Sequence, residues 1–324
     1  MAVPLFFVIS GFCIHLAGLS RPPGPAFALN FYLERLIRIY PAWLVAVAFS
    51  AIVLAAMDQE VSFGMILSHL TLTNGFVNDY RLNAALWSVS VECFLYLLYP
   101  AWLSMRRRLG LSAAALASAM VCGMSCIATS VIHPEASGPA IWFFLNVWSG
   151  WVAGAVLAEI WMSKTRMRLT RASWWILGLV AASLHIALSA RGFYVGPWKF
   201  FSLPITISLF VWPLALLLLF GESLQAKGSH RLTQVVWRAM VSVGAFSYSL
   251  YLLHIPLQSL RLLVWSAVPS VLWVQAFVLA AWLGLVLAVA WICYRWVELP
   301  ASRIGRRLLG RAPEPTLAVS AASD

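Results

Sequence analysis

Nine apolar runs, each long enough to cross a lipid bilayer, limit what this chain can fold into. They lie near residues 2–18, 40–57, 85–104, 111–132, 141–161, 173–190, 199–220, 239–260 and 271–294. A run of about 20 apolar residues spans the hydrocarbon as a helix. Only 10% of the residues are charged, whereas soluble domains have roughly 25%. The sequence therefore predicts an all-α, polytopic membrane protein with about nine transmembrane helices.

Two regions are too polar to belong to these helices. Residues 58–86 form the longest polar connection, and four side chains mark it as a loop: Asn74, Asn78, Asp79 and Asn83. The end of the chain, APEPTLAVSAASD, has the composition of a disordered segment. We therefore predict a membrane domain over residues 1–300 and a disordered cytoplasmic tail over residues 301–324.

The basic residues favour one orientation in the membrane, because Lys and Arg concentrate in cytoplasmic connections. With the N-terminus outside, most of the 22 Lys and Arg residues fall on the inner side, and four remain outside: Arg81, Arg191, Lys199 and Arg261. We expect a multi-pass protein of the inner (cytoplasmic) membrane with a cytoplasmic C-terminus. The net charge of +11 is then a topology signal, and no nucleic-acid partner is predicted.

The cysteines point to neither a disulfide framework nor a zinc site. All five lie inside apolar runs: Cys13, Cys93, Cys122, Cys126 and Cys293. Paired cysteines at CxxC spacing would indicate metal binding or redox chemistry, and the sequence has no such pair. We predict no metal site.

A carboxylate inside the run LWSVSVECFLYLLYP, residues 86–100, marks the first candidate site. An ionised side chain at the centre of a bilayer helix costs roughly 2.5–3.5 kcal/mol. The polar residues of this run share one helix face, at i, i+4, i+8 and i+11: Ser88, Glu92, Tyr96 and Tyr99. Such a stripe faces the bundle interior or a water-filled cavity. Glu92 is therefore a candidate catalytic residue, and the alternative is a protonated Glu92 in a structural interhelical hydrogen bond.

Two arginines precede the second apolar run. Arg35 and Arg38 are three residues apart in FYLERLIRIYP, residues 31–41, and share a helix face on the predicted inner side. Paired guanidinium groups can bind phosphate oxygens through forked hydrogen bonds. The pair is a candidate phosphate-binding site, with ordinary topology-setting charge as the alternative.

Small residues interrupt the first apolar run, in VPLFFVISGFCIH at residues 3–15. Ser10 and Gly11 are small enough to let another helix backbone approach closely, so helix packing is an alternative to any binding role. His15 lies near the predicted inner end, where an interfacial histidine is a simpler interpretation than a catalytic one.

A second polar stripe follows FSYSLYLLHIPLQSLR, residues 246–261. Its members share one helix face: Ser247, Tyr251, His254, Gln258 and Arg261. His254 is deep in the apolar run, and either catalysis or a satisfied buried histidine accounts for it.

Five motifs in order give the chain a resemblance to a known family. They are LFFVISGF, FYLERLIRIYP, WSVSVECFLYL, FSYSLYLLHIP and VELP, and together they cover nearly the whole chain. In this order they resemble the integral-membrane acyltransferase-3 family, which includes O-antigen O-acetylases. Glu34 stands where the family has the first of its adjacent arginines, whereas Arg35 and Arg38 match.

The resemblance implies transfer of an acyl group, commonly acetyl, from acyl-CoA to a hydroxyl of a glycan, glycolipid or lipid-linked acceptor, without a resident cofactor. Catalytic roles would fall to Glu92 and His254, and CoA binding to Arg35 and Arg38. Four residues of the motifs would contact the substrates: Ser10, Trp87, Ser88 and Tyr251.

The family also implies ten core helices, of which the first carries an Arg and the histidine thought to be catalytic. This chain starts at what resembles the second helix, so we expect a further apolar segment encoded upstream of Met1. Without that histidine, a catalytically inactive relative is one alternative. A small-molecule transporter is another, although the internal repeats of transporters are not seen in the sequence.

Overall fold

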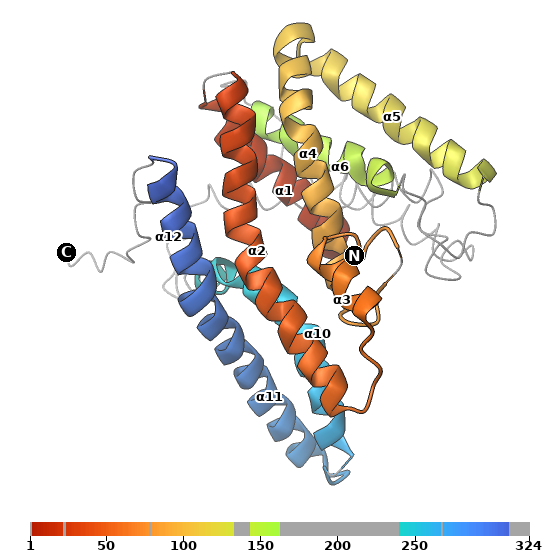
Figure 1. Ribbon diagram of the computed structural model, residues 1–324, viewed down its shortest axis with the longest axis vertical. Coiled ribbons are helices and arrows are strands. Elements are labelled where there is room, and N and C mark those ends of the chain that lie inside the picture. Colours follow the sequence, from red (N-terminus) through yellow and green to blue (C-terminus); the bar gives the residue numbers. More distant parts are fainter. Residues whose placement is uncertain are drawn as a thin grey trace, which may run out of the picture. The chain divides into compact units, whose positions relative to one another are not determined.

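The structure, a computed structural model, describes residues 2–21, 24–77, 79–132, 143–162, 240–266 and 268–310 (Figure 1). Every regular secondary-structure element in these ranges is a helix, as the apolar runs predict. The elements in chain order are α1 (Ala2–Leu19), α2 (Pro25–Ala56), α3 (Phe63–Leu70), α4 (Leu86–Leu109), α5 (Leu111–Ile132), α6 (Phe143–Met162), α10 (Ser247–Trp265), α11 (Leu272–Cys293), the π-helix η2 (Tyr294–Glu298) and α12 (Leu299–Leu308).

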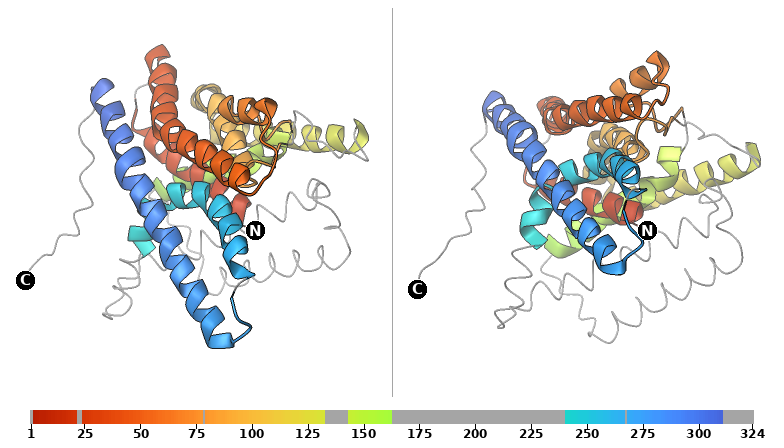
Figure 2. Two further views of the ribbon diagram at one scale, coloured as in Figure 1. Left: turned by 60° about the horizontal axis from the view of Figure 1, so that its bottom comes forward. Right: turned by 90° about the horizontal axis from the view of Figure 1, so that it is seen from below.

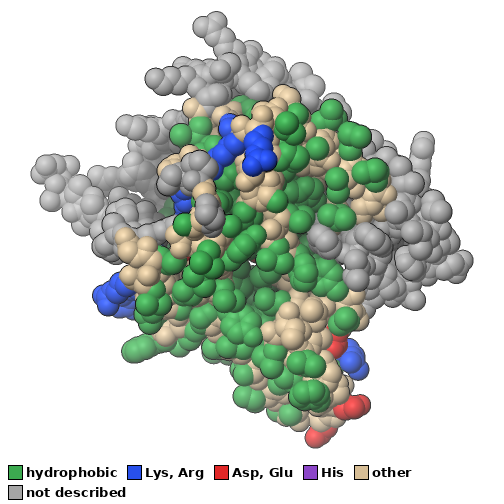
Figure 3. All heavy atoms as spheres, turned by 45° about the horizontal axis from the view of Figure 1, so that its top comes forward, with side chains coloured by type: hydrophobic (Ala, Val, Ile, Leu, Met, Phe, Trp, Pro, Cys, Tyr) green, Lys and Arg blue, Asp and Glu red, His purple; other side chains and the backbone are tan. Residues whose placement is uncertain are grey.

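Three helices in the described part of the chain are long and apolar enough to cross a membrane. They cover Ala26–Ala56, Leu86–Leu109 and Leu272–Leu308. Shorter apolar helices cover Leu5–Leu19, Leu111–Ser125 and Val147–Met162. Hydrophobic side chains also dominate the visible surface of the described residues (Figure 3), as contact with lipid requires. Nine spans remain a prediction, since the expected runs at 173–190 and 199–220 lie outside the described residues.

The chain divides into two compact units. The first contains Met1–Gly24, Gly75–Asn78 and Ser88–Ser229, and so includes α1, α5, α6 and nearly all of α4. The second contains Pro25–Asn74, Asp79–Trp87 and His230–Asp324, and so includes α2, α3, α10, α11 and α12.

The core of the first unit is a close crossing of α1 and α6. A Cβ atom on Gly11 would lie 1.9 Å from the carbonyl oxygen of Trp151, and one on Gly154 would lie 2.0 Å from that of Val8. Membrane helices approach this closely only where small residues meet. The prediction that Gly11 admits another backbone is therefore confirmed.

The second unit is organised around α2, which packs against α10 and α12. The Tyr248 hydroxyl on α10 donates to the Ile39 carbonyl on α2 at 3.0 Å. Gly305 of α12 lies against the side chain of Ile37. Figure 2 shows α11 continuing through η2 into α12 as one long helical rod.

The structure differs from the sequence prediction in two polar segments. The predicted loop 58–86 contains α3, because the Ser62 side chain accepts from the Met65 N–H and caps the helix. Helix α12 extends to Leu308, eight residues into the segment predicted as a disordered tail. Its basic residues are good helix formers, and packing against α2 supports them. Residues 311–324 lie outside the described part.

The helix α3 carries a fully buried histidine whose protonation should affect stability. His69 Nδ1 donates to the Met65 carbonyl at 2.7 Å. Burial lowers the pKa of His69 below its ordinary 6.5, although the Met65 carbonyl and Asp79 act in the opposite direction. As the pH falls below about 6.5, the unfolded chain therefore binds more protons than the folded chain, and the free energy of unfolding decreases.

We expect His69→Asn, which keeps a donor for the Met65 carbonyl, to remove part of this acid destabilisation. The measurement compares unfolding midpoints in detergent between pH 7.5 and 5.5 for the parent and the variant. The same decrease in both proteins would show that His69 does not contribute.

Candidate active site

The first unit buries the Glu92 carboxylate in a chain of hydrogen bonds across three helices. Glu92 is only 5% exposed. Its Oε1 accepts from the Tyr96 hydroxyl one turn along α4. The Tyr96 oxygen lies 3.2 Å from Ser10 Oγ on α1, and Ser10 Oγ lies 3.2 Å from Trp151 Nε1 on α6. The predicted residues Ser10 and Glu92 are therefore brought together through Tyr96.

The donor and acceptor properties of these side chains give the series of hydrogen bonds a single direction. An indole N–H can only donate, so Trp151 donates to Ser10. The Tyr96 proton points to Glu92, so Ser10 must donate to the Tyr96 oxygen. Each hydroxyl thus accepts from one side and donates to the other, and the series ends on the carboxylate. This arrangement directs three protein donors, one after another, toward the Glu92 carboxyl group.

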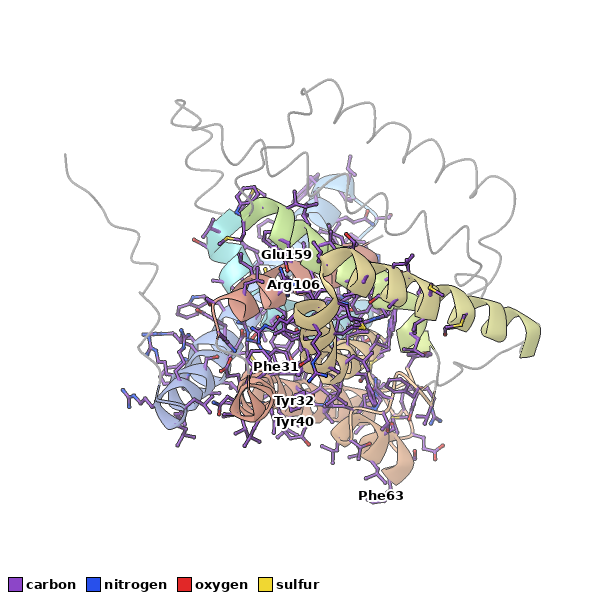
Figure 4. The ribbon with its side chains drawn as sticks, turned by 90° about the horizontal axis from the view of Figure 1, so that it is seen from above. Phe31, Tyr32, Tyr40, Phe63, Arg106 and Glu159 are labelled. Carbon is purple, nitrogen blue, oxygen red and sulfur yellow. The ribbon has the colours of Figure 1, made fainter. Side chains whose placement is uncertain are left out.

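A second buried network lies further along the same face of α4. His15 is fully buried, with Nδ1 3.2 Å from the Tyr99 hydroxyl and Nε2 2.8 Å from Glu159 Oε1. The other oxygen of Glu159 accepts from the guanidinium of Arg106, at the end of α4. Figure 4 shows Arg106 and Glu159 side by side. The network therefore joins a cation, a carboxylate and an imidazole.

Sequence reasoning missed Glu159, Arg106 and Trp151. A usable signal existed for Glu159, because it is the single charged residue in the apolar run 141–161, just as Glu92 is in its own run. The argument from the cost of burying a carboxylate applies equally to both. Arg106 was interpreted as topology charge, and no sequence signal separates Trp151 from the other 16 tryptophans.

The second unit holds the predicted arginine pair close to carboxylates. The Arg35 guanidinium is 3.9 Å from Glu34 and lies over the Phe31 ring, 5.7 Å from its centroid. Arg38 is exposed, and its charge acts on buried Glu298. Glu298 belongs to the VELP motif.

Two of the family motifs meet at Glu298. Its Oε2 accepts from the Ser249 hydroxyl of the FSYSLYLLHIP motif at 2.9 Å. Glu298 is the last residue of the π-helix η2, and π-helical turns often occur at functional sites. Arg38 belongs to a third motif, FYLERLIRIYP, and its charge also acts on Glu298. Three of the sequence motifs therefore interact at Glu298 within the second unit.

The other predicted residues of the second unit bond to backbone carbonyls or lie near the start of α4. The Tyr251 hydroxyl donates to the Ala85 carbonyl at 3.0 Å, and His254 Nδ1 lies 2.6 Å from the Tyr251 carbonyl. Trp87 is half-buried in the first turn of α4. The neighbouring Ser88, which belongs to the first unit, is fully buried.

The predicted site residues thus fall into two groups, one in each unit. Ser10, Ser88 and Glu92 belong to the first unit, and the others belong to the second: Arg35, Arg38, Trp87, Tyr251 and His254. In the part of the chain that the structure describes, no three His, Cys, Asp or Glu side chains are placed to hold a metal ion.

Comparison with known proteins identifies the family. The sequence pattern of the acyltransferase domain matches residues 1–295, so the chain belongs to this family, and the resemblance seen in the motifs is confirmed. The chain is 23% identical over 273 residues to acyltransferase MdmB of Streptomyces mycarofaciens, covering 78% of this chain and 67% of that protein.

A second relative matches over a shorter stretch. An uncharacterised protein of Haemophilus influenzae is 28% identical over 112 residues, which is 30% of this chain and 46% of the relative. The chain therefore spans less than half the length of that relative. No solved structure matches the chain.

Proposed function

We propose that the protein is a membrane O-acyltransferase that moves an acyl group, in the first place acetyl, from acyl-CoA to a hydroxyl of a glycan or lipid-linked acceptor. The family supports acyl transfer as the reaction class. The apolar helices support the membrane as its location, and we place the protein in the inner membrane with a cytoplasmic C-terminus. A CoA donor comes from the cytoplasm, which agrees with the inner position that the charge pattern predicts for Arg35 and Arg38.

The observation that carries this proposal is the buried carboxylate at the end of the Trp151–Ser10–Tyr96–Glu92 chain. Acyl transfer to a hydroxyl needs a group that holds or deprotonates the attacking oxygen. It also needs donors for the charge that develops on the thioester carbonyl. Glu92 supplies an acceptor that can hold the attacking hydroxyl, and the ordered hydroxyls beside it keep the carboxyl group in position.

The decisive experiment incubates the purified 324-residue chain, in nanodiscs, with radiolabelled acetyl-CoA and host membrane glycans. We expect label on sugar hydroxyls, released by mild base as acetate. Glycans without label, with CoA thiol not released, would contradict the proposal and favour an inactive relative.

The donor side is tested in the same preparation by equilibrium binding of acetyl-CoA. If Arg35 and Arg38 bind the phosphates, Arg38→Ala weakens binding, and Arg38→Lys restores it poorly because an ammonium cannot make a forked contact. Arg81→Ala is the matched control, since Arg81 pairs with Asp79 in the polar connection. Equal affinity of all variants would limit the arginine pair to setting topology.

A further inference from the structure

Among the histidines in the described ranges, His15 is the one whose side chain bonds a carboxylate. Its Nε2 lies 2.8 Å from Glu159 Oε1. His69 and His254 instead direct Nδ1 at backbone carbonyls, those of Met65 and Tyr251. A carboxylate partner orients an imidazole and stabilises its protonated form, which is the arrangement that general bases use.

The contacts of His15 determine which of its nitrogens carries the proton. Glu159 also accepts from the Arg106 guanidinium, and this cation favours the ionised carboxylate. An ionised carboxylate only accepts hydrogen bonds, so His15 Nε2 must donate to it. Nδ1 therefore keeps its lone pair, which accepts from the Tyr99 hydroxyl at 3.2 Å.

We propose that His15 is a proton acceptor for acyl transfer and that Glu159 is its positioning residue. The proposal rests on the proposed function. As the acceptor hydroxyl oxygen bonds to the thioester carbonyl carbon, its proton passes to His15 Nδ1. Collapse of the tetrahedral adduct breaks the carbon–sulfur bond, and the CoA thiolate takes the proton back from Nδ1. Glu159 compensates the positive charge of His15 between these two steps.

Tyr99 occupies the position from which a substrate hydroxyl would donate. At 3.2 Å its bond to Nδ1 is longer than the roughly 2.5–3.0 Å common for hydroxyl donors, so a better-placed hydroxyl can replace it. A Cβ atom at Gly18 would lie 2.0 Å from the Tyr99 hydroxyl oxygen. Glycine at this position therefore gives the Tyr99 hydroxyl the room to reach His15 Nδ1.

The imidazole is also held in place by aromatic rings. The rings of Tyr99 and Trp102 lie edge-on to His15, with centroids 6.0 and 5.2 Å away. Trp102 is itself fixed, because its Nε1 donates to Ser118 Oγ at 3.0 Å. A base held by packing and by a carboxylate loses little freedom when it accepts a proton, which favours catalysis.

The test measures steady-state transfer from radiolabelled acetyl-CoA to host membrane glycans by the 324-residue chain. His15→Gln keeps a donor for Glu159 and removes the basic nitrogen. We expect kcat to fall about 100-fold with the KM for acetyl-CoA unchanged. His69→Asn, the replacement of another buried histidine by an amide, is the control and should turn over like the parent at neutral pH.

The pH–rate profile separates a positioning role for Glu159 from a structural one. The groups that face His15 are Glu159 on α6 and, on α4, Tyr99, Arg106 and Arg107. The parent rate should rise with pH as His15 loses its proton. Glu159→Gln should move this rise to lower pH and reduce kcat, because a neutral amide no longer stabilises protonated His15.

The outcomes distinguish this inference from the proposed function. A parent without transfer overturns the proposed function and the role of His15 with it. An active parent with an equally active His15→Gln variant overturns the role of His15 alone. If His15→Gln does not fold, Glu159→Gln decides: an unchanged kcat with an unchanged pH profile overturns the proposal.

Discussion

Replacing Glu92 by Gln should lower the rate of acyl transfer about 1,000-fold while the protein stays folded. The amide has nearly the shape of the carboxylate, and its oxygen can still accept from Tyr96. What disappears is the negative charge on which the Trp151–Ser10–Tyr96 donors converge. The substitution therefore removes the capacity to hold a proton or a partial positive charge, and leaves the packing of α1, α4 and α6 in place.

The measurement is the initial rate of labelled acetyl transfer, with the unfolding midpoint in detergent as the test of folding. Glu60→Gln is the matched control, because Glu60 is exposed in the connection before α3 and should leave the rate unchanged. Full activity in Glu92→Gln would show that the buried carboxyl is a neutral structural group.

The second large effect concerns the crossing of α1 and α6. Gly11→Ala and Gly154→Ala should each reduce the free energy of unfolding by about 3 kcal/mol, the upper part of the range for overpacked interiors. In both cases the added methyl meets a backbone carbonyl about 2 Å away. A backbone oxygen within a helix cannot turn aside as a flexible side chain can, so the two helices must separate.

The unfolding midpoint and the yield of monodisperse protein measure this effect. Gly123→Ala, on α5, is the control, because a Cβ atom there meets nothing within 4 Å. It should be neutral or slightly stabilising, since Ala favours a helix over Gly by up to about 1 kcal/mol. Equal stability of all three variants would mean that α1 and α6 do not cross as described.

Within the described residues, the apolar runs predicted the long helices, but not the short helices α3 and α12 or all of the helix ends. Helix α5 begins and ends as its apolar run does, at residues 111 and 132. Helix α2 begins at Pro25, whereas its apolar run begins near residue 40. The reason is that hydropathy detects the segment in lipid, whereas Glu, Arg and Leu continue a helix equally well outside it. Hydropathy therefore predicts the part of α2 that lies in lipid, and it does not predict the residue at which the helix begins.

The candidate site was predictable along a single helix but not across helices. The spacing of Glu92, Tyr96 and Tyr99 correctly placed them on one buried face. It could not show that Tyr96 turns to Ser10 while Tyr99 turns to His15, because those choices depend on which helices pack against α4. Hydrogen bonds between residues far apart in the chain have no local sequence signature.

Two neighbouring helical segments of the second unit, α2 and the rod Leu272–Leu308, are longer than a bilayer is thick. Their length affects where a soluble substrate can first contact the protein. Helix α2 has 32 residues and the rod Leu272–Leu308 has 37, which at about 1.5 Å per residue gives roughly 48 and 55 Å. The hydrocarbon of a bilayer is only about 30 Å thick. Measured along its axis, each helix therefore exceeds this thickness by about 18 Å or more.

The packing of Gly305 against Ile37 puts the two projections together at the basic end of α2. The extra length of about 18 Å exceeds the thickness of one headgroup layer, which is roughly 5–8 Å. Five arginines lie along the projecting segments: Arg35, Arg38, Arg303, Arg306 and Arg307. Under the proposed function, the acyl-CoA donor would then meet these arginines in the aqueous phase, above the lipid, before its acyl end enters the membrane.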